Sequence, residues 1–254
     1  MRWHPKKSSV YPILVIIAFF VVWEGLSRTV LDPRWFSSPD LVLKALIHWI
    51  AAGQIWAQIA STLAGTATGF IIGSILGMLL GLALGLSKVF RDISSPYVFA
   101  LYSMPFLAMA PLFVVWFGIS MASKSAFTAV AVLLLITFTT QDGVSNVPPD
   151  LVITLKVMGA NRYQIIRKVM LPAAATSMLL GIRTSVPLAV KATVFAELVA
   201  STSGLGHSIV SAASQFDLAK VFAALIVLGV LGWCLDTLLS LLERYLPTGG
   251  YTDG

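Results

Sequence analysis

The feature that most restricts the fold of this chain is segment 61–86, which contains no charged side chain. A helix that crosses the hydrocarbon core of a bilayer needs ~20 apolar residues, and a segment of this kind is typical of such a helix. Only 11% of the residues in the whole chain are charged, whereas soluble domains average about 25%. The chain therefore lacks the polar groups that would cover a globular surface. We expect an all-α, polytopic membrane protein and exclude an ordinary soluble enzyme.

Apolar segments of similar length recur along the sequence and predict about six transmembrane helices in a single domain, residues 1–254. The expected spans are 11–26, 61–86, 96–118, 125–140, 177–200 and 221–242. Between the first two spans, residues 41–50 are expected to form a short amphipathic helix at the membrane surface.

The distribution of basic residues predicts the orientation of these spans. Lysine and arginine are more frequent in the segments on the side of the N-terminus, and cytoplasmic loops carry this excess. Both termini and the long polar segment 141–172 are therefore expected in the cytoplasm, and Lys124 is expected in an outer loop. The same basic loops account for the formal net charge of +6, so no nucleic-acid partner is expected.

Glycine recurs at every fourth residue of segment 61–86, and small residues at this spacing let two helix backbones approach closely. The row consists of Gly65, Gly69, Gly73, Gly77, Gly81 and Gly85. Each four-residue step turns by about 40° around a helix, so the row is expected to wind around a central helix against which several neighbours pack. The same geometry would allow helices to slide during gating, and the sequence does not separate these two roles.

Prolines interrupt two of the predicted spans and are expected to bend them. Pro105 and Pro111 lie in span 96–118, and Pro187 lies in span 177–200. Each proline removes a backbone N–H donor, which membrane helices tolerate where a neighbouring helix or cavity water satisfies the freed carbonyl. Bent helices are consistent with a transport pathway and equally with simple packing.

The polar segment 141–172 is expected to contain two short helices with apolar and basic faces. Asp150 can cap the first helix, and Gly159 can end it. The second helix is expected over residues 161–170 and to end at Pro172. From the residues alone, these helices fit a docking surface for a soluble partner and an amphipathic loop on lipid headgroups equally well.

Gly159 is followed, after nine residues, by Val169, and then by Leu171 and Pro172. This spacing resembles the EAA loop of bacterial ABC importer permeases, whose pattern ends G-x9-I-x-L-P. Other segments that fit the same family are Met104-Pro105, Trp116-Phe117-Gly118, Gly181-Ile182-Arg183, Ala196-Glu197 and Gly204-Leu205-Gly206. The resemblance covers residues 60–245 and points to the subfamily that imports nitrate, sulfonates, taurine, bicarbonate or thiamine precursors. The acidic residue of the E-A-A triplet is absent.

The resemblance implies the type I ABC importer permease architecture, and a transporter subunit that is not itself an enzyme. It implies a homodimer in a bacterial inner membrane that forms the translocation pathway for a small anionic or zwitterionic solute. A cytoplasmic ABC ATPase dimer would bind ATP and Mg, and a periplasmic or lipid-anchored binding protein would deliver the solute. The chain itself would hold no cofactor and no metal. The residues implied to couple to the ATPase are Gly159, Ala160, Asn161, Arg162 and Tyr163. The alternative is a stand-alone channel or secondary carrier, which would need no coupling loop.

Charged residues within the predicted spans are candidates for function because a charge inside a membrane is costly. The candidates for the translocation pathway are Arg183, Pro187, Lys191 and Glu197. Arg183 and Asp236 lie at similar depth on their spans and are expected to form a structural ion pair. Glu197 is expected either to line an outer gate or to cap the loop that follows it.

Lys191 is the deepest of these charges, about 21 Å from the cytoplasmic end of its span at ~1.5 Å per residue. Two arrangements remain open for it. It can pair with Glu24, at comparable depth in the first span, or it can face the pathway and attract an anion. Arg183, Pro187 and Lys191 fall within about 80° of one another on a helix, which places the bend and two positive charges on one face.

Overall fold

Helices account for the regular secondary structure of the computed structural model, which describes residues 10–29 and 37–243 of the chain. No strand occurs in these ranges, so the predicted all-α class is confirmed. In chain order the elements are α1 (Val10–Thr29), α2 (Pro39–Ala51), α3 (Gln54–Leu86), α4 (Lys88–Ser103), the 3₁₀-helix η1 (Phe106–Met109), α5 (Ala110–Phe117), α6 (Met121–Ser145), α7 (Pro149–Val157), α8 (Arg162–Ile165), the π-helix η2 (Ile166–Met170), α9 (Leu171–Val199), α10 (Leu205–Ser214) and α11 (Leu218–Glu243).

Four of these helices, α3, α6, α9 and α11, are long and apolar enough to cross a membrane. A fifth span results if α4 and the η1–α5 segment, which are bent by 88°, are taken as one broken span. The break lies at Pro105, one of the prolines that were predicted to bend this span, and Pro105 directly precedes η1. Met104 has an extended backbone because a residue before proline avoids the helical region. These five match the predicted spans from 61–86 onward. The predicted span 11–26 corresponds to α1, which is outside this set, and it stays a prediction.

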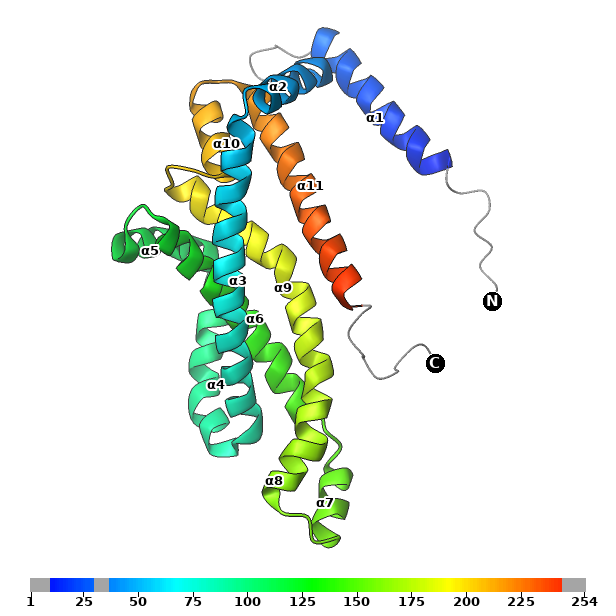
Figure 1. The fold of residues 1–254 in the computed structure, drawn as a ribbon, viewed down its shortest axis with the longest axis vertical. Coiled ribbons are helices and arrows are strands. Elements are labelled where there is room, and N and C mark those ends of the chain that lie inside the picture. The colour runs from blue at the N-terminus through cyan, green and yellow to red at the C-terminus, as the bar shows by residue number, and fades with distance from the viewer. Residues whose placement is uncertain (1–9, 30–36, 244–254) are drawn as a thin grey trace.

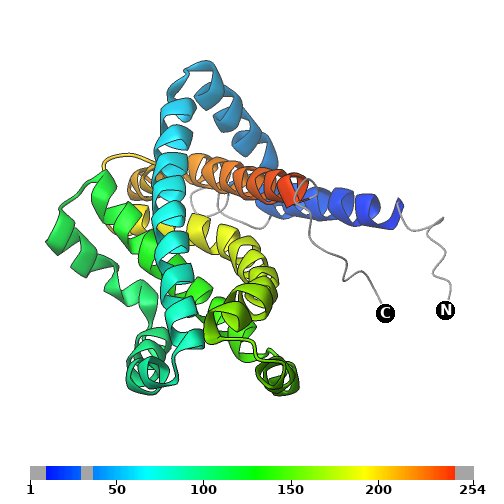
Figure 2. The same cartoon turned by 60° about the horizontal axis from the view of Figure 1, so that its bottom comes forward.

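The long helix α3 runs along most of the length of the molecule and connects two distinct ends (Figure 1). α2 and α10 lie at one end, called the α10 end below, and the α7–α8 segment lies at the other, the α7 end. α2 corresponds to the predicted short helix 41–50. α3 packs on α6 and α6 packs on α9 along much of their lengths, and α11 packs against α10, α2 and α9. In both views α1 projects away from the other helices (Figure 2).

The glycine row of α3 faces α6 along most of its length, whereas the sequence predicted a row that winds around a central helix packed by several neighbours. From Gly69 to Gly85, the atoms nearest to each added Cβ would belong to α6; a Cβ on Gly73 would lie 2.4 Å from the Ala129 carbonyl oxygen. At Gly65 the nearest atom to an added Cβ belongs to α9, Thr193 Cγ2 at 3.1 Å. The reason is that an i,i+4 row is itself inclined to the helix axis, and a second helix laid obliquely can follow it. α3 is still central, because it also contacts α9, α4 and α10.

The polar segment differs from its prediction at two points. Asp150 lies in the first turn of α7 and not at its cap, because this helix starts at Pro149, a residue type favoured at the first helical position. The second short helix does not end at Pro172, since it continues through the π-helical turn η2 into α9. Pro172 lies in the first turn of α9, directly after the π-helical turn. The wider π turn accommodates its ring and its missing N–H, so the helix continues through this proline.

Candidate functional site

A buried ion pair joins α6 and α9 near the α10 end. Lys124 Nζ lies 3.0 Å from Glu197 Oε1, and the two side chains are only 5% and 0% exposed. Lys124 belongs to the first turn of α6, which begins at Met121, so it lies in a helix and not in a loop between spans, while its predicted outer side stays a prediction. The predicted span began at residue 125 because hydropathy detects only the apolar part of a helix. The first turn of α6 carries polar side chains that are buried by other parts of the protein, so hydropathy did not include it.

Hydrogen bonds satisfy the polar atoms around this pair. Lys124 Nζ also donates to Ser61 Oγ at 2.7 Å, and Thr62 Oγ1 donates to Glu197 Oε2 at 2.9 Å. The hydroxyl oxygens of Ser61 and Ser203 lie 2.8 Å apart. Such bonds are needed because a buried ion pair must replace the water that both charges lose. Lys124, Glu197, Ser61, Thr62 and Ser203 are called the polar cluster below.

Glu197 also caps the N-terminus of α10, a helix that was not predicted. The Gly206 N–H donates to Glu197 Oε2 at 3.0 Å, and the Leu205 N–H donates to Thr62 Oγ1 at 2.9 Å. The first N–H groups of a helix have no partner within it, and the helix dipole favours a carboxylate at this position. Of the two roles expected for Glu197, the structure shows the second, because this side chain caps the segment that follows it.

The Gly204-Leu205-Gly206 motif fits closely around Glu197. A Cβ on Gly204 would lie 2.1 Å from the carboxyl carbon of Glu197, and a Cβ on Gly206 would lie 2.7 Å from Glu197 Cβ. Gly204 also has a φ of +116°, a conformation that residues with a side chain rarely adopt. Both glycines of the motif are therefore required by the packing of this carboxylate.

Buried threonines extend the contact between α3, α6 and α9 beyond the polar cluster. Thr66 Oγ1 donates to Thr193 Oγ1 at 3.1 Å, and the hydroxyls of Thr128 and Thr193 lie 2.8 Å apart. Thr66 belongs to α3, Thr128 to α6 and Thr193 to α9. The three helices are thus joined by hydrogen bonds near the α10 end and by close backbone packing along the rest of their contact.

The exposed face of α9 carries the other predicted pathway residues. Arg183, Pro187 and Lys191 are all exposed, and α9 continues through Pro187, so the three share a face as predicted. The predicted Arg183–Asp236 pair and the two alternatives for Lys191 stay predictions, because similar depth on two helices does not by itself decide whether their side chains face each other.

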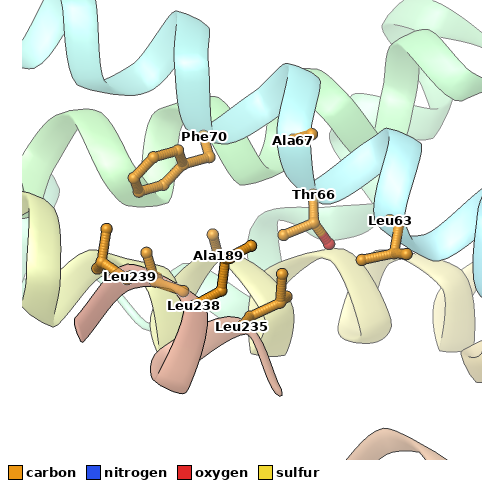
Figure 3. Close-up of a pocket in the computed structure, with 9 residues that line it drawn as sticks. Leu63, Thr66, Ala67, Phe70, Ala189, Leu235, Leu238 and Leu239 are labelled. Carbon is orange, nitrogen blue, oxygen red and sulfur yellow. The ribbon is translucent and has the colours of Figure 1, made fainter. Parts of the chain in front are cut away.

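An apolar cavity of about 180 Å³ lies between α3, α9 and α11 (Figure 3). Its lining residues are Leu63, Thr66, Ala67, Phe70, Val186, Ala189, Leu235, Leu238 and Leu239. Thr66 supplies the only hydroxyl among them, and that hydroxyl is hydrogen-bonded to neighbouring protein atoms. Neither Arg183 nor Lys191 lines this cavity, so it offers no charged group to an anionic solute.

The turn between α7 and α8 is fixed by its own hydrogen bonds and by α3. Gly159 has a φ of +83°. Asn161 forms a capping box with Gln164, whose N–H donates to Asn161 Oδ1 at 2.9 Å. The Arg162 guanidinium donates to the Leu86 carbonyl oxygen at 3.3 Å. The last of these bonds ties the turn to the C-terminal end of α3.

Large apolar side chains project from this turn at the α7 end. Val157, Met158 and Tyr163 are 84%, 77% and 66% exposed, respectively. Apolar side chains gathered on an exposed turn mark a surface for interaction with another protein or with a membrane. Tyr163 was among the predicted coupling residues, whereas Val157 and Met158 were not, because only the folded turn shows that they point away from the protein.

The α7–α8 turn and the Lys124–Glu197 pair both lie in a part of the chain that matches a known protein family. Residues 69–246 match a family model described as "Binding-protein-dependent transport system inner membrane component". The chain is 38% identical, over 58% of its length, to the "Putative aliphatic sulfonates transport permease protein SsuC" of Bacillus subtilis (strain 168), and this match covers 53% of that protein. It is 33% identical, over 92% of its length, to the "Riboflavin transport system permease protein RibX" of Chloroflexus aurantiacus, of which the match covers 87%.

A solved structure shows the same fold. A chain from the inward facing conformations of the MetNI methionine ABC transporter matches with a TM-score of 0.64 and 22% sequence identity. The match covers 75% of the present chain and 94% of that chain. The α7–α8 turn and the Lys124–Glu197 pair both lie within the residues that the family model matches.

Proposed function

Because the chain belongs to the family of binding-protein-dependent transport system inner membrane components, and is thus a permease subunit of an ABC transporter, we propose that two copies of it form the translocation pathway of an importer in a bacterial inner membrane. A cytoplasmic ATPase dimer binds ATP and Mg and powers the cycle. A periplasmic or lipid-anchored binding protein delivers the solute at the α10 end. Both termini and the α7–α8 turn face the cytoplasm, an orientation that the excess of basic residues on that side supports.

The main support for this proposal is the structure of the α7–α8 turn, which has an exposed apolar surface and a hydrogen bond to α3. Its exposed apolar side chains offer contacts to a partner, and the Arg162–Leu86 hydrogen bond ties it to α3. The turn also connects α6 directly to α9, two of the spanning helices. A partner that moves this turn would move three spans at once, as an ATPase that drives transport must do. The proposed contact residues are Gly159, Ala160, Asn161, Arg162 and Tyr163, together with Val157 and Met158.

The test is to purify the tagged chain from the membranes in which it is made and to reconstitute it with the ATPase that co-purifies. We expect uptake into vesicles to require ATP, the ATPase and a binding protein. Uptake by vesicles that contain the chain alone would contradict the proposal and would favour a stand-alone channel or secondary carrier.

Gly159→Asp is expected to reduce ATP-driven uptake without reducing the amount of inserted protein. A Cβ added to Gly159 would have nothing within 4 Å, and aspartate tolerates a left-handed backbone better than most residues, so we expect the fold to be retained. The new carboxylate would face the ATPase, where a central interface substitution costs ~2 kcal/mol or more, about 30-fold in affinity. The measurements are ATPase pull-down and uptake in the same membranes.

The matched control for this variant is Gly53→Asp. Gly53 has a φ of +71° and nothing within 4 Å of an added Cβ, but it lies at the opposite end of α3. The control also places an aspartate at a positive φ, but at the end of α3 away from the α7–α8 turn, so it should bind the ATPase normally. Equal behaviour of the two variants would show that the α7–α8 turn has no special role in coupling.

A small anionic or zwitterionic solute is the proposed cargo. Arg183 and Lys191 lie on one exposed face of α9, and a homodimer would present this face twice along a common pathway. A positive charge in a membrane segment is stable where it meets water or a counter-charge. The similarity to SsuC, whose name refers to aliphatic sulfonates, supports an anionic group on the solute, whereas the name of RibX refers to riboflavin.

Lys191→Met is expected to lower the uptake of an alkanesulfonate by about tenfold or more, since one hydrogen bond to a charged group contributes ~1.5–3 kcal/mol. Lys191→Arg should retain part of the activity because it keeps the charge. Lys88→Met is the control, since Lys88 is exposed at the α7 end, at the start of α4. If Lys191→Met and Lys88→Met transport equally well at equal abundance, Lys191 does not contact the solute.

A further inference from the structure

The Lys124–Glu197 pair lies at the ends of α6 and α9 that are farthest from the α7–α8 turn. The chain leaves α6 at Ser145, forms the turn and returns as α9. α6 and α9 therefore make a helical hairpin whose connection is the turn itself (Figure 1). The ion pair closes this hairpin at its other end, so the two helices are fastened at both ends.

The interior of the hairpin leaves little room for sliding. A Cβ on Gly143 of α6 would lie 2.5 Å from Ser177 Cβ, and a Cβ on Gly181 of α9 would lie 2.1 Å from Thr139 Oγ1. The third helix, α3, lies against α6 through the glycine row. Close-packed interfaces transmit displacement because they do not deform continuously. The three helices are therefore expected to move as one body.

The segment between α9 and α10 is attached to the far end of this body. Lys124 Nζ lies 3.5 Å from the Ser203 carbonyl oxygen, which accepts from it, and the Gly204 N–H donates to Gln58 Oε1 at 2.6 Å. The capping bond from Gly206 to Glu197 adds the first turn of α10. The polar cluster thus connects residues 200–206 to α3, α6 and α9 together.

We propose that Lys124 and Glu197 are positioning residues for transport. They fasten the hairpin and residues 200–206, so that movement of the α7–α8 turn displaces the segment at the opposite end of the permease. This inference rests on the proposed coupling role of the turn. Replacing a buried ion pair with well-packed apolar residues is often neutral or stabilising. Stability alone therefore does not explain this pair, whereas a positioning role does.

The first test asks whether residues 200–206 stay attached to α3 during the cycle. Ser61→Cys and Ser203→Cys are introduced together with Cys234→Ser, which removes the single native cysteine. The two hydroxyl oxygens are 2.8 Å apart, so sulfur atoms at these positions can form a disulfide. With the ion pair intact, the assembled transporter should move the same amount of solute per ATP in the oxidised and the reduced state. A block of transport on oxidation would overturn the proposal.

The second test removes the ion pair in the same cysteine background with Lys124→Met and Glu197→Gln. In the reduced state, we expect the solute transported per ATP to fall by at least about fivefold, the lower end of typical coupling between distant sites. Oxidation should restore it, because the disulfide replaces the lost attachment. Unchanged transport per ATP in the reduced state would overturn the proposal, as would a loss that oxidation does not repair. If this variant does not assemble, the first test decides alone.

A matched control separates position from charge. Lys44 and Asp40 form an ion pair of 3.3 Å on α2, at the same end of the molecule, with side chains 73% and 39% exposed. Lys44→Met with Asp40→Asn makes the same chemical change and should leave transport per ATP unaltered. The proposed function is judged by the unsubstituted chain: if it shows no ATP-dependent uptake, the proposed function fails, whereas normal uptake with unaffected pair variants contradicts only the present inference.

Discussion

Gly73→Ala is expected to lower the amount of folded protein more than any other single methyl addition to the glycine row. Its Cβ would lie 2.4 Å from the Ala129 carbonyl oxygen and 2.9 Å from Val132 Cβ. A backbone oxygen cannot turn away as a side chain can, so α3 and α6 would have to separate. Overpacking costs ~1–3 kcal/mol and occasionally more, a large part of the roughly 5–15 kcal/mol that keeps a protein folded.

Two further alanine variants serve as references for the size of the destabilisation expected for Gly73→Ala. Gly229 of α11 has nothing within 4 Å of an added Cβ, so Gly229→Ala should be neutral or gain up to ~1 kcal/mol of helix propensity. At Gly65 the nearest atoms are side-chain atoms, Thr193 Cγ2 at 3.1 Å and Lys124 Cδ at 3.2 Å, so Gly65→Ala should be intermediate. The measurement is the thermal unfolding midpoint of each purified protein. Equal midpoints for Gly73→Ala and Gly229→Ala would contradict the close contact of α3 with α6.

Gly204→Ala is expected to disrupt the polar cluster. The added methyl group would collide with the Glu197 carboxylate, with its Cβ 2.1 Å from the carboxyl carbon, and the backbone φ of +116° adds strain of ~1–3 kcal/mol. Because Glu197 is held by Lys124 and by the Gly206 N–H, the carboxylate cannot move without losing these bonds. We expect a lower unfolding midpoint and faster amide hydrogen exchange at the start of α10.

Gly53→Ala is the control for a positive φ without a collision. Gly53 also has a positive φ, but an added Cβ there would meet no atom within 4 Å. Gly53 has a left-handed backbone (φ +71°, ψ −6°), whereas Gly204 lies in a region that is essentially limited to glycine (φ +116°, ψ 167°). The difference between the two variants therefore contains the collision with Glu197 together with the larger backbone strain at Gly204. A Gly204→Ala protein whose exchange at α10 equals that of Gly53→Ala would show that the capping contact does not hold this helix.

The spans could be predicted from the sequence because a membrane imposes a simple rule on composition. Backbone groups must be satisfied within each segment, so long and predominantly apolar runs become helices, and α3, α6, α9 and α11 appear where such runs occur. The turn at Gly159 could also be placed, because its resemblance to a known loop fixes the glycine and the residues after it. These features depend on local sequence or on a motif.

The polar cluster could not be predicted because it depends on which helix faces share an interface. Lys124 appeared as a loop residue, since nothing near it in the sequence shows that α9 brings Glu197 to within 3.0 Å. The predicted Arg183–Asp236 pair depends on the same missing information, as depth along a helix says nothing about direction around it. One sequence pattern could have indicated the Lys124–Glu197 pair. Lys124 is a single lysine directly before an apolar segment, and Glu197, a carboxylate that needs a counter-charge, lies near the end of another apolar segment.

The glycine row also has a consequence for the order in which the chain enters the membrane. α4 and α5 separate α3 from α6 along the sequence, so the ribosome releases α3 well before the helix that packs on it. Until α6 has been synthesised, the strip that the missing side chains leave on α3 lacks its helical partner, and we expect lipid tails to occupy it. Closure of the α3–α6 interface must expel those tails, and a chain truncated before Met121 would keep them in place.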